Sequence, residues 1–261
     1  MDYKTKTEKG NNIWLMQGDC LERMEEIPDN SVDLVLCDPP YEVSAMWWDK
    51  TFPWSDVWKE LERVSKPQTP KVFTATQPFT TRLINTNMNN FKYCWVWEKN
   101  FSTNFLHAKR QPLRKHEDVV VFYNKTGQYY PQKTTGHTPT QSAKGSSNGN
   151  LWHGTNTRNY EGGDTSRYPT SIIKVDAVDP KQRLHTSQKP VELMEYLIRT
   201  YTDEGETVLD FTMGSGSTVI SANNLDRDSI GIEMGCCEKK GHKYEGIEWT
   251  DVIAEQLNLN H

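Results

Sequence analysis

Residues 31–41 read SVDLVLCDPPY, an apolar segment that ends abruptly in Asp38-Pro39-Pro40-Tyr41. The run from Val32 to Leu36 has the composition of a short strand that is buried on both faces of a parallel sheet. Two prolines end this strand, because proline has a fixed φ and no backbone N–H to donate. Ligands of open α/β sheets bind beyond the carboxyl ends of the strands, so residues 38–41 are candidates for a functional site.

A four-residue motif carries a false-positive risk. Residues 38–41 are equally compatible with an ordinary strand-ending turn that has a capping aspartate. The rest of the chain has to distinguish these two interpretations.

Length and composition restrict the class of protein. A chain of 261 residues can form one large α/β domain with an insertion, or two modest domains. Its longest apolar runs are about half a dozen residues, well short of the roughly 20 that cross a bilayer. The five cysteines are scattered and form no C-x-x-C pair, which favours reduced thiols. We therefore expect a soluble protein of the cytoplasm.

The charge is unevenly distributed along the chain. The formal net charge is -5, yet residues 99–189 hold 14 Lys/Arg against 6 Asp/Glu. A basic segment in an otherwise acidic protein is typical of a surface that meets nucleic-acid phosphates, although a solvated surface can have the same composition.

The first part of the chain alternates strands and helices. Apolar residues predict a strand over 13–16, a helix over 21–27 and the strand that ends at Asp38, which together form a βαβ unit of a parallel sheet. Asp19 and Asp38 should then lie at the same edge of that sheet. Further strands are predicted over 71–75, 93–97 and 119–123, the last two as an antiparallel hairpin.

Residues 124–184 lack clear periodicity and are rich in Gly, Ser, Thr, Asn and basic residues, with tyrosines and Trp152 among them. A segment of this length without regular elements is uncommon inside a compact domain unless it is functional or disordered. The mixture of aromatic and basic residues favours a recognition insert over a linker.

A second candidate site follows the predicted strand over 207–211. The turn after it contains Gly214 and Gly216, which allow close approach of backbone to a ligand, and the next strand ends in Glu233. A carboxylate in that place can accept hydrogen bonds from a ribose. The turn is neither a dinucleotide fingerprint, since Val219 stands where glycine is needed, nor a phosphate loop, since no lysine follows Gly216. An adenosine ligand without phosphates remains, and S-adenosylmethionine fits this description.

Several motifs together resemble those of amino DNA methyltransferases. Asp38-Pro39-Pro40-Tyr41 is similar to their catalytic motif, and DFTMGSGST at residues 210–218 is similar to their cofactor motif. The order of the catalytic motif, the basic insert, HTSQKP at residues 185–190 and the cofactor motif resembles the permuted β class. The similarity extends from Gly18 to Glu233. Two departures are Asp-Phe-Thr in place of Asp-Pro-Phe at residues 210–212, and Thr-Ser-Gln-Lys in place of Thr-Gln-Lys at residues 186–189; neither removes a chemically needed group.

The resemblance implies a Rossmann-like α/β fold of S-adenosylmethionine-dependent methyltransferases. Its sheet would be mostly parallel and seven-stranded, with an antiparallel hairpin, circular permutation and an inserted target-recognition region. Residues 1–123 would form the catalytic half, residues 124–184 the target-recognition insert and residues 185–261 the cofactor-binding half.

The resemblance also implies an activity: sequence-specific methyl transfer from S-adenosylmethionine to the exocyclic N6 of an adenine that is flipped out of double-stranded DNA. An exocyclic amine is a poor nucleophile because its lone pair is delocalised into the ring. Asp38 and the Pro39 carbonyl would accept its hydrogen bonds, and Tyr41 would stack on the base. Trp47 and Phe79 are further candidates for a base sandwich, although core packing is the alternative for each. This chemistry requires no metal.

By the same resemblance, Asp19 would contact the adenine of the cofactor and Glu233 its ribose. A helix cap is the alternative for Asp19, and an ordinary surface lysine is the alternative for Lys189. The full set of expected site residues is, for catalysis, Asp38, Pro39, Pro40 and Tyr41, and for the cofactor, Asp19, Asp38, Lys189, Asp210, Phe211, Gly214, Gly216, Thr218 and Glu233.

Other activities are disfavoured to different degrees. Cytosine C5 methylation needs a cysteine nucleophile, usually after proline, and the chain has no Pro-Cys pair. Cytosine N4 methylation remains the main alternative, although it is more often associated with Ser-Pro-Pro-Tyr. A protein-glutamine methyltransferase and a non-catalytic DNA-binding subunit are weaker alternatives, the second because Asp38 and Tyr41 are intact. By analogy with the class we expect a homodimer, and a cognate restriction endonuclease is a candidate partner.

Overall fold

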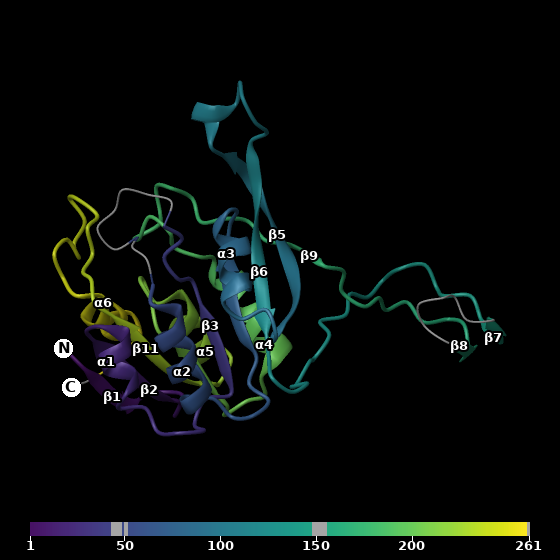
Figure 1. Ribbon diagram of the computed structural model, residues 1–261, viewed down its shortest axis with the longest axis horizontal. Coiled ribbons are helices and arrows are strands. Elements are labelled where there is room, and N and C mark those ends of the chain that lie inside the picture. Colours follow the sequence, from purple (N-terminus) through teal and green to yellow (C-terminus); the bar gives the residue numbers. More distant parts are fainter. Residues whose placement is uncertain (43–48, 50–51, 148–155, 260–261) are drawn as a thin grey trace. The chain divides into compact units, whose positions relative to one another are not determined.

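The computed structural model describes residues 1–42, 49, 52–147 and 156–259 (Figure 1). The chain divides into two compact units, one formed by residues 1–130 and 171–261 and the other by residues 131–170. None of the helices in the described ranges has both the length and the apolar character needed to cross a membrane.

One mixed sheet organises the larger unit, with strand order β1-β2-β11-β10-β3-β4-β6-β5-β9. Strands β2, β11, β10, β3 and β4 are mutually parallel, whereas β6 is antiparallel to both β4 and β5. This arrangement confirms the predicted parallel core and the antiparallel hairpin. The strands are β1 (Tyr3–Lys6), β2 (Asn12–Gln17), β3 (Leu34–Cys37), β4 (Lys71–Ala75), β5 (Phe91–Thr103), β6 (Arg114–Phe122), β9 (Ile172–Lys174), β10 (Thr207–Asp210) and β11 (Asp228–Glu233).

The expected number of seven strands was wrong, because the described residues contribute nine strands to the sheet. The strand β1 extends it beyond β2, and β9 extends it beyond β5. Both are short edge strands, and each buries one side chain: Tyr3 in β1 and Ile173 in β9. A strand of this kind has no apolar run that would reveal it in the sequence.

Helices cover both faces of the sheet. The buried side chains of α2 recur at helical spacing (Val57, Leu61, Val64), and those of α4 do the same (Leu193, Leu197). The helices are α1 (Cys20–Met24), α2 (Trp54–Val64), α3 (Phe79–Thr86), α4 (Val191–Tyr201), α5 (Ser217–Asn224) and α6 (Trp249–Gln256).

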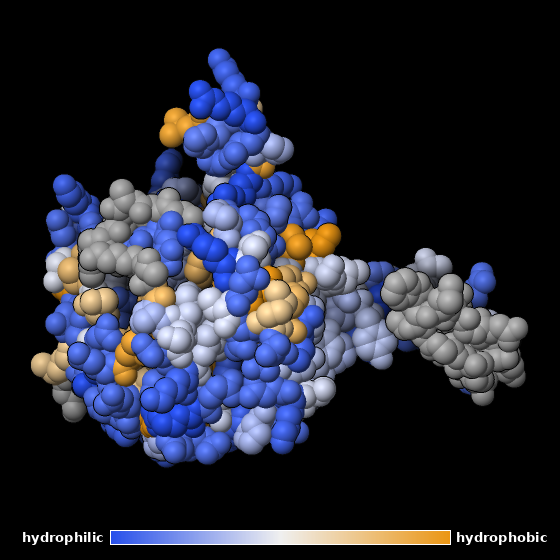
Figure 2. Space-filling model, viewed as in Figure 1, coloured by the Kyte–Doolittle hydropathy of each residue, from blue (hydrophilic) through white to orange (hydrophobic). Residues whose placement is uncertain are grey.

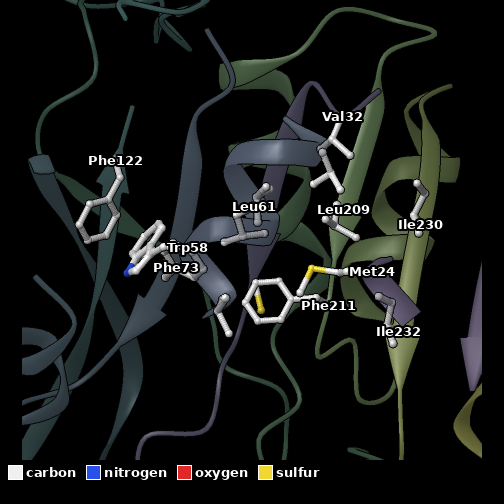
Figure 3. Close-up of a cluster of buried hydrophobic side chains, with 14 of the residues drawn as sticks. Met24, Val32, Trp58, Leu61, Phe73, Phe122, Leu209, Phe211, Ile230 and Ile232 are labelled. Carbon is white, nitrogen blue, oxygen red and sulfur yellow. The ribbon is translucent and has the colours of Figure 1, made fainter. Parts of the chain in front are cut away.

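The central strands have apolar side chains on both sides. In β3, Val35 and Cys37 join the cluster that contains α2 and α3, while Leu34 and Leu36 join the cluster that contains α4. This double burial is what the uninterrupted apolar run predicted. Figure 3 shows part of the first cluster, where Trp58 and Leu61 of α2 lie near Phe73, Phe122 and Leu209 of the sheet.

The parallel strands also align the candidate site residues. The carboxyl ends of β2, β3, β10 and β11 lie at the same edge, and they are followed or ended by Asp19, Asp38, Asp210 and Glu233. The expectation that Asp19 and Asp38 share one edge is therefore confirmed.

The smaller unit, residues 131–170, lies within the range 124–184 that the sequence assigned to an insert. Its regular structure is an antiparallel pair, β7 (Ala143–Ser147) with β8 (Asn156–Tyr160). An isolated bridge between Thr134 and Arg167 also pairs the two ends of this unit.

Candidate active site

A pocket with a cavity volume of about 430 Å³ opens at the carboxyl edge of the parallel strands. Its lining includes both motifs, although they are about 170 residues apart in the chain. Of the expected site residues, the lining contains Asp19, Asp38, Pro39, Pro40, Tyr41, Lys189, Asp210, Phe211, Gly214, Thr218 and Glu233.

The Asp38 carboxylate is held by three donors of the chain. Its Oδ1 accepts hydrogen bonds from Tyr41, at 2.7 Å, and from the hydroxyl of Thr74. Its Oδ2 lies 2.6 Å from the ammonium of Lys189. An ionised carboxylate has about four acceptor positions, so this network leaves room for one more donor.

Lys189 is a buried cation in a balanced cluster of charges. Its ammonium lies 2.6 Å from Asp38 and 3.6 Å from Glu117, and Glu117 also pairs with Lys99. Burial alone would lower the pKa of Lys189, but the two carboxylates outweigh it and raise that pKa above its ordinary value. Burial likewise opposes ionisation of Glu117, but Lys189 and Lys99 lower its pKa. Lys189 is thus no surface lysine.

Tyr41 is fixed by aromatic packing as well as by its hydroxyl. Its ring stacks on that of Phe79, with centroids 5.2 Å apart and planes inclined by 24°, and the Lys189 ammonium lies 5.4 Å from its ring centre. Burial, followed by the charges of Asp38 and Glu117, raises the pKa of the Tyr41 hydroxyl. Phe79 is buried in the core, and the Tyr41 ring packs against it. Trp47, the other candidate for a base sandwich, lies outside the described residues.

The glycine-rich turn connects β10 to α5. Gly214 has φ +50° and lines the pocket, whereas Gly216 has φ +79° and is the N-cap of α5. A Cβ at Gly216 would lie 2.6 Å from the side chain of Ile253, so this glycine serves close packing against α6. Gly214 therefore lies at the pocket wall, whereas Gly216, which was also expected to bind the cofactor, packs against α6 instead.

Asp210 ends β10 as a buried carboxyl. It accepts a hydrogen bond from the backbone N–H of Thr212, at 3.1 Å, and the hydroxyl of Thr218 donates to it. Burial outweighs these hydrogen bonds and raises the pKa of Asp210 to about 7.

Glu233 ends β11 and is oriented by backbone donors. Its Oε2 accepts from the N–H of Gly214, at 2.9 Å, and its Oε1 accepts from those of Met234 and Gly235, at 3.0 and 2.8 Å. Burial nevertheless raises the pKa of Glu233. After the adjacent strand β2, Asp19 accepts from the N–H of Leu21, at 2.9 Å, so it caps α1 while it also lines the pocket.

Sequence reasoning missed three contributors to this site. Glu117 and Thr74 join the Asp38 network from β6 and β4, and Trp249, the first residue of α6, lines the pocket beside His185. Glu117 does carry a signal, since Glu117 and Asp118 are two carboxylates that precede the apolar run of β6. Its partner could be found only from the strand pairing.

A mixed α/β sheet with its pocket at the carboxyl edge, beside a glycine-rich turn and a strand-ending carboxylate, defines a Rossmann-like nucleotide-binding class. Within that class, a model of N6 and N4 methyltransferases described as DNA methylase matches residues 32–240. The chain belongs to this DNA methylase family, as its motifs predicted.

Individual relatives agree with this assignment. The type II methyltransferase M1.MboII of Moraxella bovis is 24% identical over 94% of this chain and 97% of its own. The type II methyltransferase M.HpaI of Haemophilus parainfluenzae is 22% identical over 95% of this chain and 84% of its own.

Solved structures share the fold. M1.HpyAVI in complex with SAM matches with a TM-score of 0.61 and 20% identity, over 94% of this chain and 99% of that one. The cytosine-N4-specific PvuII DNA methyltransferase matches with a TM-score of 0.62 and 16% identity, over 98% and 97%.

The packing of the glycine turn leads to a stability prediction. We expect Gly216→Ala to lower the free energy of unfolding by about 2–4 kcal/mol, because it adds a clash with Ile253 to the strain of a left-handed backbone. Gly205→Ala is the matched control, since Gly205 has φ +78° and no atom within 4 Å of the added Cβ. Denaturant unfolding of both variants tests this; equal losses would exclude the clash.

Proposed function

We propose that the chain transfers a methyl group from S-adenosylmethionine to the exocyclic N6 of an adenine flipped out of double-stranded DNA. The observation that carries this proposal is the Asp38 carboxylate, held by Thr74, Tyr41 and Lys189 in the same pocket as the glycine turn and Glu233. The preference for adenine over cytosine rests on aspartate rather than serine before Pro39.

The pocket residues fit the cofactor. The Glu233 carboxylate, oriented by three backbone N–H groups, is placed to accept hydrogen bonds from the ribose hydroxyls. Asp19, which follows the adjacent strand β2, would lie near the adenine. The buried Asp210 carboxyl, with Phe211, Gly214 and Thr218, is placed for the methionine end, whose ammonium would favour its ionised form. When bound, the cofactor supplies an electrophilic methyl group on a sulfonium.

Asp38 and its neighbours would activate the amine. Lys189 pairs with one oxygen of Asp38, at 2.6 Å, and the free acceptor position of Asp38 would take one N–H of the base. With the Pro39 carbonyl accepting the second N–H, the nitrogen lone pair would be free to attack the methyl group that the cofactor supplies. As this methyl group left the sulfonium sulfur, Asp38 would accept the surplus proton of the nitrogen. Stacking of the base on Tyr41 adds roughly 1–3 kcal/mol of binding.

The same proposal divides the chain into three functional parts. Residues 1–123 would form the catalytic half, residues 185–261 the cofactor-binding half, and residues 124–184 a target-recognition insert in the permuted order of the β class. The basic composition of that insert supports contact with phosphates. The similarity to type II methyltransferases also supports a role beside a restriction endonuclease. By analogy with the β class, the assembly would be a homodimer.

Methyl transfer to double-stranded DNA of mixed sequence tests this proposal. The chain is incubated with radiolabelled S-adenosylmethionine and genomic DNA, and label is counted separately in the DNA and protein fractions. We expect label in DNA and none in protein. Label confined to protein would favour the glutamine methyltransferase, and binding of DNA without any transfer would favour a non-catalytic subunit.

Cofactor affinity should depend on pH through Asp210. Since the pKa of Asp210 is about 7 without ligand, most of this group is protonated at pH 6 and most is ionised at pH 7.5. A ligand that requires the carboxylate should bind about five- to tenfold more tightly at pH 7.5 than at pH 6. Calorimetric titration with S-adenosylhomocysteine, which has the same methionine end, checks this. Asp210→Asn should weaken binding and abolish the dependence; an unchanged dependence would assign it to another group.

A further inference from the structure

The hairpin formed by the end of β5 and the start of β6 projects past the edge of the sheet at which the pocket opens (Figure 1). Ala75, the last residue of β4, pairs with Asp118 of the antiparallel strand β6. Residues that precede Asp118 therefore extend beyond the carboxyl ends of the parallel strands. We call residues 99–116 the projecting hairpin.

Apolar side chains stand at the end of this hairpin. Leu106 is 98% exposed and Phe105 is 67% exposed, and Leu113 on the returning side is also exposed. Figure 2 shows hydrophobic atoms at the tip among strongly hydrophilic neighbours. Large apolar side chains in such a position indicate a contact that is absent from the isolated chain.

The tip is an ordered turn rather than a loose loop. Asn104 has a left-handed backbone (φ 72°), and Phe105–His107 form one turn of 3-10 helix. The N–H of His107 donates to the carbonyl of Asn104, at 3.0 Å, and that of Arg110 donates to the carbonyl of His107, at 2.8 Å. The backbone thus presents Phe105 and Leu106 in a defined position.

The charge of the projecting hairpin indicates that its partner is DNA. The projecting hairpin contains five Lys/Arg and no Asp/Glu. Lys99 and Lys115 are paired with Glu117 and Glu98 at its base, whereas Lys109 and Arg110 lie exposed beside the apolar tip. Two apolar side chains on a narrow hairpin are far too small for a stable protein interface, which buries roughly 800 Å² per partner. Apolar side chains flanked by cations are instead suited to insertion between base pairs while phosphates are bound.

The hairpin is also connected directly to the active site. Glu117 of β6 belongs to the Lys189–Asp38 charge cluster, and Leu113 is four residues away along the chain, roughly 13 Å in extended backbone. Phe105 and Leu106 lie past the Thr103–Arg114 pair of the hairpin, so the tip stands roughly 10 Å or more beyond Glu117. This distance is comparable to the width of the DNA major groove, roughly 12 Å.

We propose that Phe105 and Leu106 enter the base stack of duplex DNA and support the gap left by the flipped base, while Lys109 and Arg110 hold the adjacent phosphates. This inference rests on the proposed function, since it concerns the same DNA substrate. It assigns base flipping to an element that lies outside the pocket and outside the insert.

The test compares Phe105→Ala/Leu106→Ala with wild type on two duplexes. Both contain the site that wild type methylates, mapped by sequencing; one is fully paired, and the other has an abasic site opposite the target. We expect kcat/KM to fall about tenfold or more on the paired duplex and less than threefold on the abasic one, where the base is already unpaired. Met88→Ala is the control, since Met88 is 55% exposed at the far end of α3 and should leave both rates unchanged.

Three outcomes would contradict the proposal that Phe105 and Leu106 enter the base stack. Unchanged activity on the paired duplex would show that the tip is dispensable, and equal losses on both duplexes would show a general defect. A change from dimer to monomer in sedimentation without DNA would make the tip a contact between copies of the chain. Failure of wild type to methylate any DNA would instead reject the proposed function.

A second variant distinguishes the role of Lys109 and Arg110 from that of Phe105 and Leu106. Lys109→Ala/Arg110→Ala should reduce the slope of log affinity against log salt by about 1–2, whereas the apolar variant should leave that slope unchanged. Equal slopes for Lys109→Ala/Arg110→Ala and wild type would show that the two cations contact no phosphates.

Discussion

Asp38→Asn should reduce the rate of methyl transfer by at least about 10³-fold while cofactor binding changes less than about threefold. The amide has the shape of the carboxylate but only one acceptor atom, and Thr74 and Tyr41 already occupy that side of the group. Its NH₂ would point toward the Lys189 ammonium or the base amine, neither of which can accept. Single-turnover transfer and calorimetric binding of S-adenosylhomocysteine measure the two effects.

Asp56→Asn is the matched control, since Asp56 is an exposed aspartate in the first turn of α2. It should leave both transfer and binding unchanged. Loss of cofactor binding in Asp38→Asn, in parallel with the loss of rate, would place Asp38 in cofactor binding rather than in activation of the base.

Lys189→Met should lower the free energy of unfolding by about 3–5 kcal/mol, because it leaves the buried carboxylates of Asp38 and Glu117 without their shared cation. Lys99 would still pair with Glu117, but Asp38 would have lost its ion pair. Denaturant unfolding at neutral pH measures the change. The double variant Lys189→Met/Asp38→Asn should recover part of the loss, since it removes the carboxylate that has lost its ion pair.

Lys243→Met is the control for this prediction. It breaks the pair with Glu255, at 2.7 Å, in which both side chains are exposed, and pairs of that kind contribute at most about 1 kcal/mol. Equal losses in Lys243→Met and Lys189→Met would show that the buried cluster contributes no more than a surface pair.

The charge cluster around Lys189 also predicts how the free energy of unfolding changes with pH. The folded-state pKa of Glu117 lies below its ordinary value, so the stability it contributes is present above about pH 4.5 and is lost as pH falls through the lowered value. The pKa of Lys189 is raised, so its contribution persists up to alkaline pH and is lost as pH rises through the raised value. Lys189→Met should therefore weaken the acid dependence of unfolding that Glu117 causes.

The parallel core and most of the site were predictable from the sequence. The strand over 32–36 is uniformly apolar, and glycines mark the turn after Asp210, so local composition alone identifies both. The parallel order of the strands then brings Asp38, Asp210 and Glu233 to one edge.

Other features depend on long-range pairing that no local pattern reveals. Glu117 joins Asp38 only because β6 lies antiparallel to β4. Lys189 is buried where two carboxylates face its ammonium and Ser217 Oγ donates to its carbonyl, at 2.8 Å. The edge strands β1 and β9 bury too few side chains to produce an apolar pattern. The exposure of Leu106 likewise follows from the register of the hairpin.

Chromatography of the bases released from methylated DNA tests the central claim most directly. DNA is incubated with the chain and methyl-labelled S-adenosylmethionine and hydrolysed to free bases. The bases are separated against N6-methyladenine and N4-methylcytosine standards, with Asp38→Asn as the parallel sample. We predict that all label co-migrates with N6-methyladenine and that the variant gives none. Label in N4-methylcytosine would contradict the choice of base, and equal label from the variant would contradict the role of Asp38.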